Sequence, residues 1–140
     1  MAAIPAYSIF SAASELAVTA AVFYVFWQGF AKGRLRPVLL GLVLGFEALA
    51  NISYMSYRLV VPHGASPERS TGMALLVTGH GVLSLLMFLA LIVYAVAAFR
   101  LDREGRNVFR EEPTRMWTFV GFWSASVLSG ELVFALTYLA

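Results

Sequence analysis

Cysteine is absent from the sequence, which excludes disulfide bonds, thiolate metal sites and cysteine catalysis within this chain. Charged residues are also scarce. They make up 13% of the 140 residues, whereas ordinary soluble domains carry about 25%. Hydrophobic residues make up 60%, so too few polar side chains remain to cover the surface of a soluble domain.

Four long apolar stretches fill most of the chain. Each reaches the ~20 residues that a helix needs to cross ~30 Å of hydrocarbon. Helices are expected because an open sheet would leave backbone groups unpaired in lipid. The sequence therefore predicts one all-α integral membrane domain over residues 1–140, folded as an antiparallel four-helix transmembrane bundle. The predicted spans are Ser8–Phe30, Pro37–Val61, Gly72–Phe99 and Arg115–Leu139.

Basic residues are concentrated in the first and third connections between these spans. Those connections hold eight of the ten lysines and arginines, and the middle connection holds only Arg58 and Arg69. Because cytoplasmic loops are enriched in Lys and Arg, we expect both termini on the outer, periplasmic side. The third connection also carries four acidic residues, so its net charge is small. The lipid bilayer is thus an expected partner, and nucleic acid is not.

Each predicted span contains one glutamate or histidine among its apolar residues, namely Glu15, Glu47, His80 or Glu131. Such groups are costly in hydrocarbon and usually serve a function. At 1.5 Å of rise per residue, Glu15, His80 and Glu131 share a level about two turns below the outer surface. Glu47 lies nearer the midplane, with Asn51 one turn closer to that level. The sequence therefore predicts that these side chains meet in one site in the outer half.

Helical spacing supports an inward polar face. In the second span Glu47, Asn51, Tyr54 and Arg58 recur at i, i+4, i+7 and i+11, which is one side of a helix. We expect Tyr54 and Arg58 at the outward mouth of the site. Comparable stripes in the other spans are Ser8, Ser11, Glu15 and Thr19; Met73, His80, Ser84, Met87 and Tyr94; and Trp117, Ser124, Glu131 and Tyr138.

Small residues also recur at helical spacing. Gly41 and Gly45 form a GxxxG pair, and Ser126 and Gly130 have the same spacing. Such faces let helices approach closely, either within the bundle, which the sequence favours, or between two copies of the chain.

The polar groups leave several functions open. They could be structural, or they could bind a proton, a cation, a metal ion or a polar head group. His80 is the candidate metal ligand, and a haem or a metal ion is a candidate cofactor. No hydrolase signature or phosphate-binding loop is present, so an enzyme is not the first expectation, although Glu and His suit acid–base chemistry.

Three short motifs carry a resemblance to a known family: Ser53-Tyr54-Met55-Ser56-Tyr57, Thr78-Gly79-His80 and Arg115-Met116-Trp117-Thr118. Over most of its length the chain resembles an uncharacterised family of small four-helix bacterial membrane proteins that are encoded beside cytochrome oxidase subunit and assembly genes. Members are richer in histidine, and Arg58 stands where a histidine would follow the tyrosines.

The resemblance implies an accessory or assembly role in the respiratory inner membrane, within a larger membrane complex or as a homo-oligomer. Our leading expectation is thus a multi-pass binding or accessory protein of the bacterial inner membrane. The alternatives are a small proton-coupled transporter or channel and a redox protein that handles a metal, a haem or a quinone.

Overall fold

The computed structural model describes residues 4, 6–60 and 70–139, except the side chains of residues 54, 55 and 57–60. The described residues form helices and no strand. Their ends lie within four residues of the predicted span ends, apart from Val61, which is outside the described residues. The helices are α1 (Ala6–Lys32), α2 (Pro37–Val60), α3 (Thr71–Arg103), α4 (Val108–Glu111) and α5 (Pro113–Tyr138).

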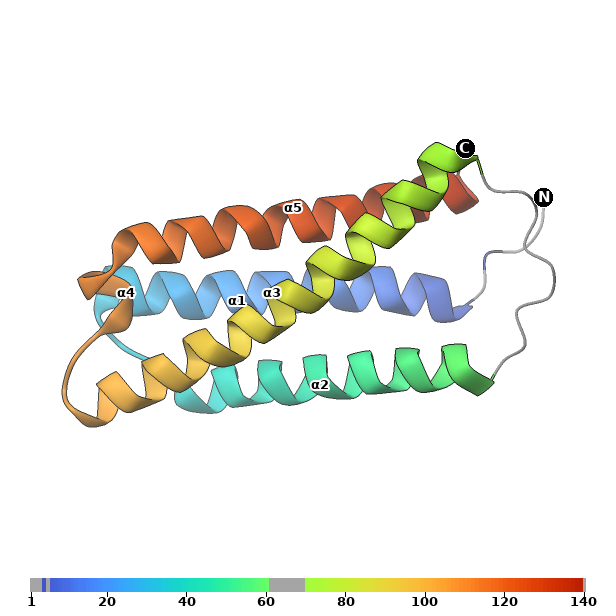
Figure 1. Cartoon of the computed structure of the whole chain (residues 1–140). Coiled ribbons are helices and arrows are strands. Elements are labelled where there is room, and N and C mark those ends of the chain that lie inside the picture. Colours follow the sequence, from blue (N-terminus) through green and yellow to red (C-terminus); the bar gives the residue numbers. More distant parts are fainter. Residues whose placement is uncertain (1–3, 5, 61–69, 140) are drawn as a thin grey trace.

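Three of these helices, α1, α3 and α5, are long and apolar enough to cross a membrane, which indicates a helical membrane protein. In α2 the described apolar stretch, Pro37–Ser53, is shorter. The four long helices lie lengthwise beside one another, and α3 crosses the others obliquely (Figure 1). α5 packs against α3 and α1, and α2 packs against α1 and α3.

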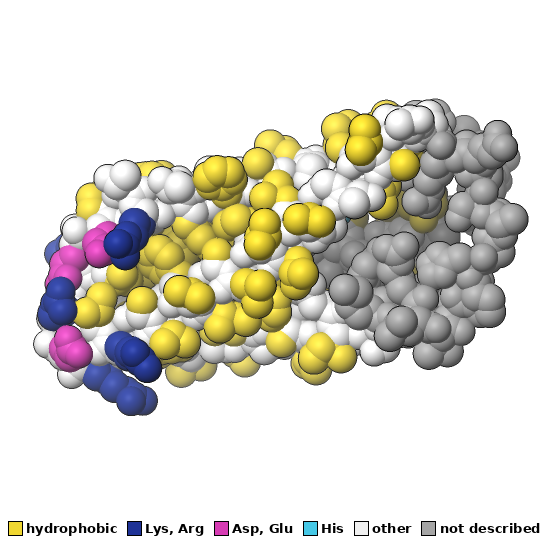
Figure 2. Space-filling model, in the orientation of Figure 1, with side chains coloured by type: hydrophobic (Ala, Val, Ile, Leu, Met, Phe, Trp, Pro, Cys, Tyr) yellow, Lys and Arg dark blue, Asp and Glu magenta, His cyan; other side chains and the backbone are white. Residues whose placement is uncertain are grey.

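Charged side chains gather at one end of this arrangement (Figure 2). We call it the basic end: the end at which residues 33–36 connect α1 to α2 and residues 104–112 connect α3 to α5. Salt bridges there are exposed, and exposed pairs contribute about 0–1 kcal/mol each. The basic side chains at this end are all exposed: Lys32, Arg34, Arg36, Arg100, Arg103, Arg106, Arg110 and Arg115.

An aromatic cluster forms the core near the basic end. The ring of Phe26 in α1 lies 4.9 Å from that of Tyr94 and 5.0 Å from those of Phe109 and Phe119, centroid to centroid. Trp123 extends the cluster along α5, 5.6 Å from Phe119. Such pairs add about 0.5–1.5 kcal/mol each beyond the area they bury. The cluster therefore joins α1, α3, α4 and α5 into one packed unit.

The short helix α4 closes this end of the bundle. Asn107 begins α4, accepting hydrogen bonds from the Phe109 and Arg110 backbone N–H groups, and its amide donates to the Gly29 carbonyl at 3.0 Å. Arg110 donates to the carbonyls of Phe30 and Ala31 at 2.9 and 2.8 Å. These carbonyls belong to the last turn of α1, where the helix itself supplies no N–H donors for them. α4 therefore caps α1 while Phe109 fills the core.

The packed core does not extend to the opposite end. Among the described residues, none is buried before Val18 in α1, after Val43 in α2, before Met87 in α3 or after Val127 in α5. The parts of the helices farther from the basic end are thus only partly buried. The four ionisable groups predicted from the sequence lie in this less packed half.

Gly41 and Gly45 do not pack as the sequence suggested. A Cβ atom at either position would meet nothing within 4 Å, and both residues are exposed. The expectation that this pair packs inside the chain is therefore wrong, because α2 turns this face away from the neighbouring helices. Gly130, in contrast, does sit at a close contact.

Gly29→Ala tests the contact between α1 and α4. A Cβ atom at Gly29 would overlap the Phe109 ring, so the substitution must displace that ring from the core. We expect a loss of about 1–3 kcal/mol of stability, the usual cost of overpacking, measured as a lower thermal midpoint in detergent. Gly45→Ala is the matched control and should leave the midpoint unchanged or raise it, since nothing surrounds that position and alanine favours helix. Equal midpoints for both variants would contradict this packing.

Candidate polar site

Side chains from two helices converge on the backbone of a third at Gly130. A Cβ atom built on Gly130 would lie 2.7 Å from His80 Cε1, 3.2 Å from His80 Nε2 and 3.0 Å from Glu15 Oε2. The His80 ring and the Glu15 carboxyl group therefore both rest against α5 in space that only glycine leaves open. By these distances, Nε2 and Oε2 are at most about 6 Å apart. Glu131 follows Gly130 directly and is half-buried.

Two hydrogen bonds fix the orientation of the His80 ring. Its Nδ1 lies 3.0 Å from Ser129 Oγ and 3.2 Å from the Ser126 carbonyl oxygen. Ser129 Oγ donates its proton to the same carbonyl at 2.7 Å, so it accepts from the ring. A carbonyl can only accept. Nδ1 must therefore carry the hydrogen, and in the neutral ring Nε2 is left as an acceptor on the side of Gly130 and Glu15.

The carboxyl group of Glu131 has an unpaired atom. Its Oε1 is buried, and no described residue donates a hydrogen bond to it. A buried acceptor left in this state costs about 1–3 kcal/mol. Glu15 lies within electrostatic range of Glu131 and of Glu47. Because ionised carboxyl groups within this range repel, protons or a cation are needed to offset their charge.

Glu47 and Asn51 form a separate polar pair on α2. The Asn51 amide donates to the Glu47 backbone carbonyl at 2.8 Å and to Glu47 Oε2 at 3.3 Å. Both residues are half-buried. The amide of Asn51 is thus used within its own helix, and of this pair only Glu47 lies within electrostatic range of Glu15. Tyr54 and Arg58 are in α2, but their side chains lie outside the described residues, and so does the predicted mouth of the site.

The apolar core begins directly below the site. Trp123 Nε1 donates to Thr19 Oγ1 at 3.1 Å, one turn of α1 from Glu15. Val18 and Val127 are buried at the same level. At the opposite end Ser8 Oγ and Tyr138 Oη are 3.0 Å apart, so the polar faces predicted for α1 and α5 do meet.

The predicted stripe of α5 is correct only in part. Trp117 is 53% exposed, and the Ser124 hydroxyl donates to the carbonyl of Val120 in its own helix. The contacts to His80 come instead from Ser126, which is buried, and from Ser129. From its spacing in the sequence, Ser126 is predicted only as a small residue that lets helices approach closely. Hydroxyl groups that orient a histidine carry no separate sequence signal, because serine is common in membrane helices.

The side chains of the site decide which metal ion or other ligand it suits. In the described part of the chain, no group of three or more His, Asp or Glu side chains is arranged to hold a metal ion. Glu15, Glu131 and His80 nevertheless present acceptor atoms on facing helices, without a hydrogen-bond donor among those atoms. This arrangement suits a ligand that brings its own N–H or O–H donors.

Ser129→Ala tests the orientation of the ring. In the wild-type protein, ¹⁵N NMR of the imidazole, at a pH where the ring is neutral, should show a protonated Nδ1 and an unprotonated Nε2. Replacement of His63, the second histidine in the sequence, leaves His80 as the one imidazole observed. Without the Ser129 acceptor we expect a mixture of the two tautomers. Ser124→Ala should change nothing, since that hydroxyl bonds within α5. A wild-type ring protonated at Nε2 would contradict the assignment.

Comparison with known proteins does not supply a function. No family model, no curated protein and no solved structure matches the chain. The resemblance to the four-helix family encoded near oxidase genes therefore stays a prediction, and the chemistry of the site rests on its own side chains.

Proposed function

We propose that the chain is a multi-pass binding protein of the bacterial inner membrane. All four long helices span the bilayer in antiparallel order, with the basic end in the cytoplasm and both termini outside. The supporting observation is the distribution of charge: eight exposed basic side chains lie at one end of three helices long enough to span. Basic residues of this kind favour the cytoplasmic side.

The ligand of the site is a small cation that carries several N–H donors, such as a protonated amine. Protons compete with this cation for the carboxyl groups. The observation that carries this proposal is Glu131 Oε1, a buried acceptor to which no described residue donates. Glu15 Oε2 and His80 Nε2 supply two further acceptors around Gly130. An ammonium group has three donors and one positive charge, which matches three acceptors in an acidic site.

The packing favours binding over conduction. Between the site and the basic end lies a buried core that includes Phe26, Phe119 and Trp123, and α4 closes the end beyond it. Passage of an ion would require this core to separate. A proton-coupled transporter is the second candidate, favoured by carboxyl groups that can exchange protons for a cation. It requires a second conformation in which α4 leaves the end of α1.

The accessory role in a respiratory membrane complex is part of the same proposal, and it rests on the family resemblance. A binding subunit of this kind would remain attached to a larger complex during gentle purification. Release of the protein free of partners, even in mild detergent, would count against this role.

Glu131→Gln tests the binding proposal. We would add methylammonium to the purified protein in weakly buffered detergent solution and record both the binding isotherm and the protons released. Wild-type protein should release protons on binding, and its affinity should fall as the pH is lowered, since protons then occupy the carboxyl groups. Glu131→Gln should weaken binding about tenfold or more, because a hydrogen bond to a charged group is worth about 1.5–3 kcal/mol.

Glu111→Gln is the matched control for this experiment. Glu111 pairs with Arg106 at the basic end, far along the bundle from the site, so its replacement should leave methylammonium binding unchanged. Equal loss of binding in both variants would show that net charge alone matters. Binding of methylammonium to wild-type protein without proton release would contradict proton competition, and absence of saturable binding would overturn the proposed ligand class.

A further inference from the structure

A groove of about 310 Å³ opens between α3 and α5, away from the polar site. Its inner part is apolar and is formed by Met87 and Ala90 of α3 and by Phe119 and Phe122 of α5. Phe122 is 57% exposed, so this part of the groove faces the surroundings of the helices. In a protein of membrane-crossing helices, those surroundings are lipid chains.

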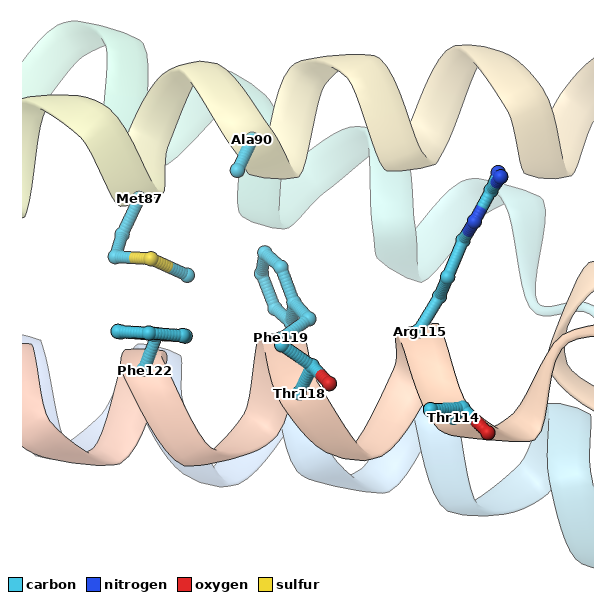
Figure 3. A pocket seen from close by; sticks show the side chains of 7 residues that line it. All are labelled: Met87, Ala90, Thr114, Arg115, Thr118, Phe119 and Phe122. Carbon is cyan, nitrogen blue, oxygen red and sulfur yellow. The ribbon is translucent and has the colours of Figure 1, made fainter.

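The other part of the groove is polar and lies toward the basic end. Thr114, Arg115 and Thr118 line it, and the Arg115 side chain extends from α5 toward α3 (Figure 3). Arg115 is exposed and contacts Glu112 Oε2 at 2.7 Å. A guanidinium group has five N–H donors, and this contact leaves others free for a second anion.

The length and polarity of the groove match one lipid molecule. From Thr114 to Phe122 it extends about 12 Å along α5, at 1.5 Å per residue. That is close to the depth of one leaflet, half of the ~30 Å hydrocarbon core. The arginine lies at the end where the other basic side chains gather, so the polar part falls at the level of lipid head groups and the apolar part at the level of acyl chains.

We propose that this groove binds one anionic phospholipid, with an acyl chain between α3 and α5 and the phosphate beside Arg115. The ligand is the lipid itself, because a free phosphate would leave the apolar part of the groove unused. Positive pockets between membrane helices on the cytoplasmic side commonly bind anionic head groups. This site is separate from the polar site around Gly130 and goes beyond the function proposed above.

Glu112 gives the proposal a test with effects of opposite sign. Its carboxylate offsets the positive charge of Arg115 and repels a phosphate bound beside it. Arg115→Gln should therefore lower the preference for anionic lipid, whereas Glu112→Gln should raise it. The probe is an equimolar mixture of phosphatidylglycerol and phosphatidylcholine, and native mass spectrometry of the full chain reports which lipid is retained. We expect wild-type protein to retain phosphatidylglycerol in excess and Arg115→Gln to reduce that excess several-fold.

Two further variants separate charge from shape. Arg103→Gln removes another exposed cation, one outside the groove, and should preserve the lipid preference. Ala90→Phe should fill the apolar part and reduce retention of both lipids. Equal retention of the two lipids by wild-type protein would overturn the proposal. So would a similar loss in Arg103→Gln and Arg115→Gln, a lower preference in Glu112→Gln, or a second copy of the chain, rather than lipid, retained through this face.

Discussion

An ionisable group among apolar helices costs free energy unless hydrogen bonds or opposite charge stabilise it. In this protein the constraint is met differently for each group. Ser129 and Ser126 satisfy Nδ1 of His80, and Asn51 donates to Glu47. Glu131 Oε1 is buried without a donor from the described residues. The polar site is thus satisfied at His80 Nδ1 and at Glu47 but incomplete at Glu131 Oε1, which is the arrangement expected of a binding site.

The basic end supplies the rigidity that such a site needs. The Phe26, Tyr94, Phe109 and Phe119 rings and the hydrogen bonds of α4 hold α1, α3 and α5 together. The Thr19–Trp123 hydrogen bond then fixes the spacing of α1 and α5 just below the acidic groups. One half of the bundle is therefore a packed apolar core, and the other half contains the polar site. A groove on the outside of the packed half leaves room for lipid to bind without disturbing either.

Much of this organisation could be predicted from the sequence, because helix length and depth follow from a fixed rise per residue. The long helices and the common level of Glu15, His80 and Glu131 were predictable in this way. Rotation and tilt of the helices were not. They depend on packing between side chains of different helices, as the outward face of Gly41 and Gly45 and the inward position of Ser126 show. The helix α4 was also missed, because its stability comes from contacts with α1 and not from its own four residues.

The distance between the Glu15 carboxyl carbon and His80 Nε2 tests the account most directly. Solid-state NMR can measure it in lipid bilayers through the dipolar coupling of a ¹³C-labelled Glu15 and a ¹⁵N-labelled His80. We predict a clear coupling, since both groups rest against Gly130 and their facing atoms are at most about 6 Å apart. The coupling should weaken in Gly130→Leu, whose side chain would push the two groups apart. Absence of any coupling in the wild-type protein would mean that the three helices do not form one site, and the proposed function would fall with it.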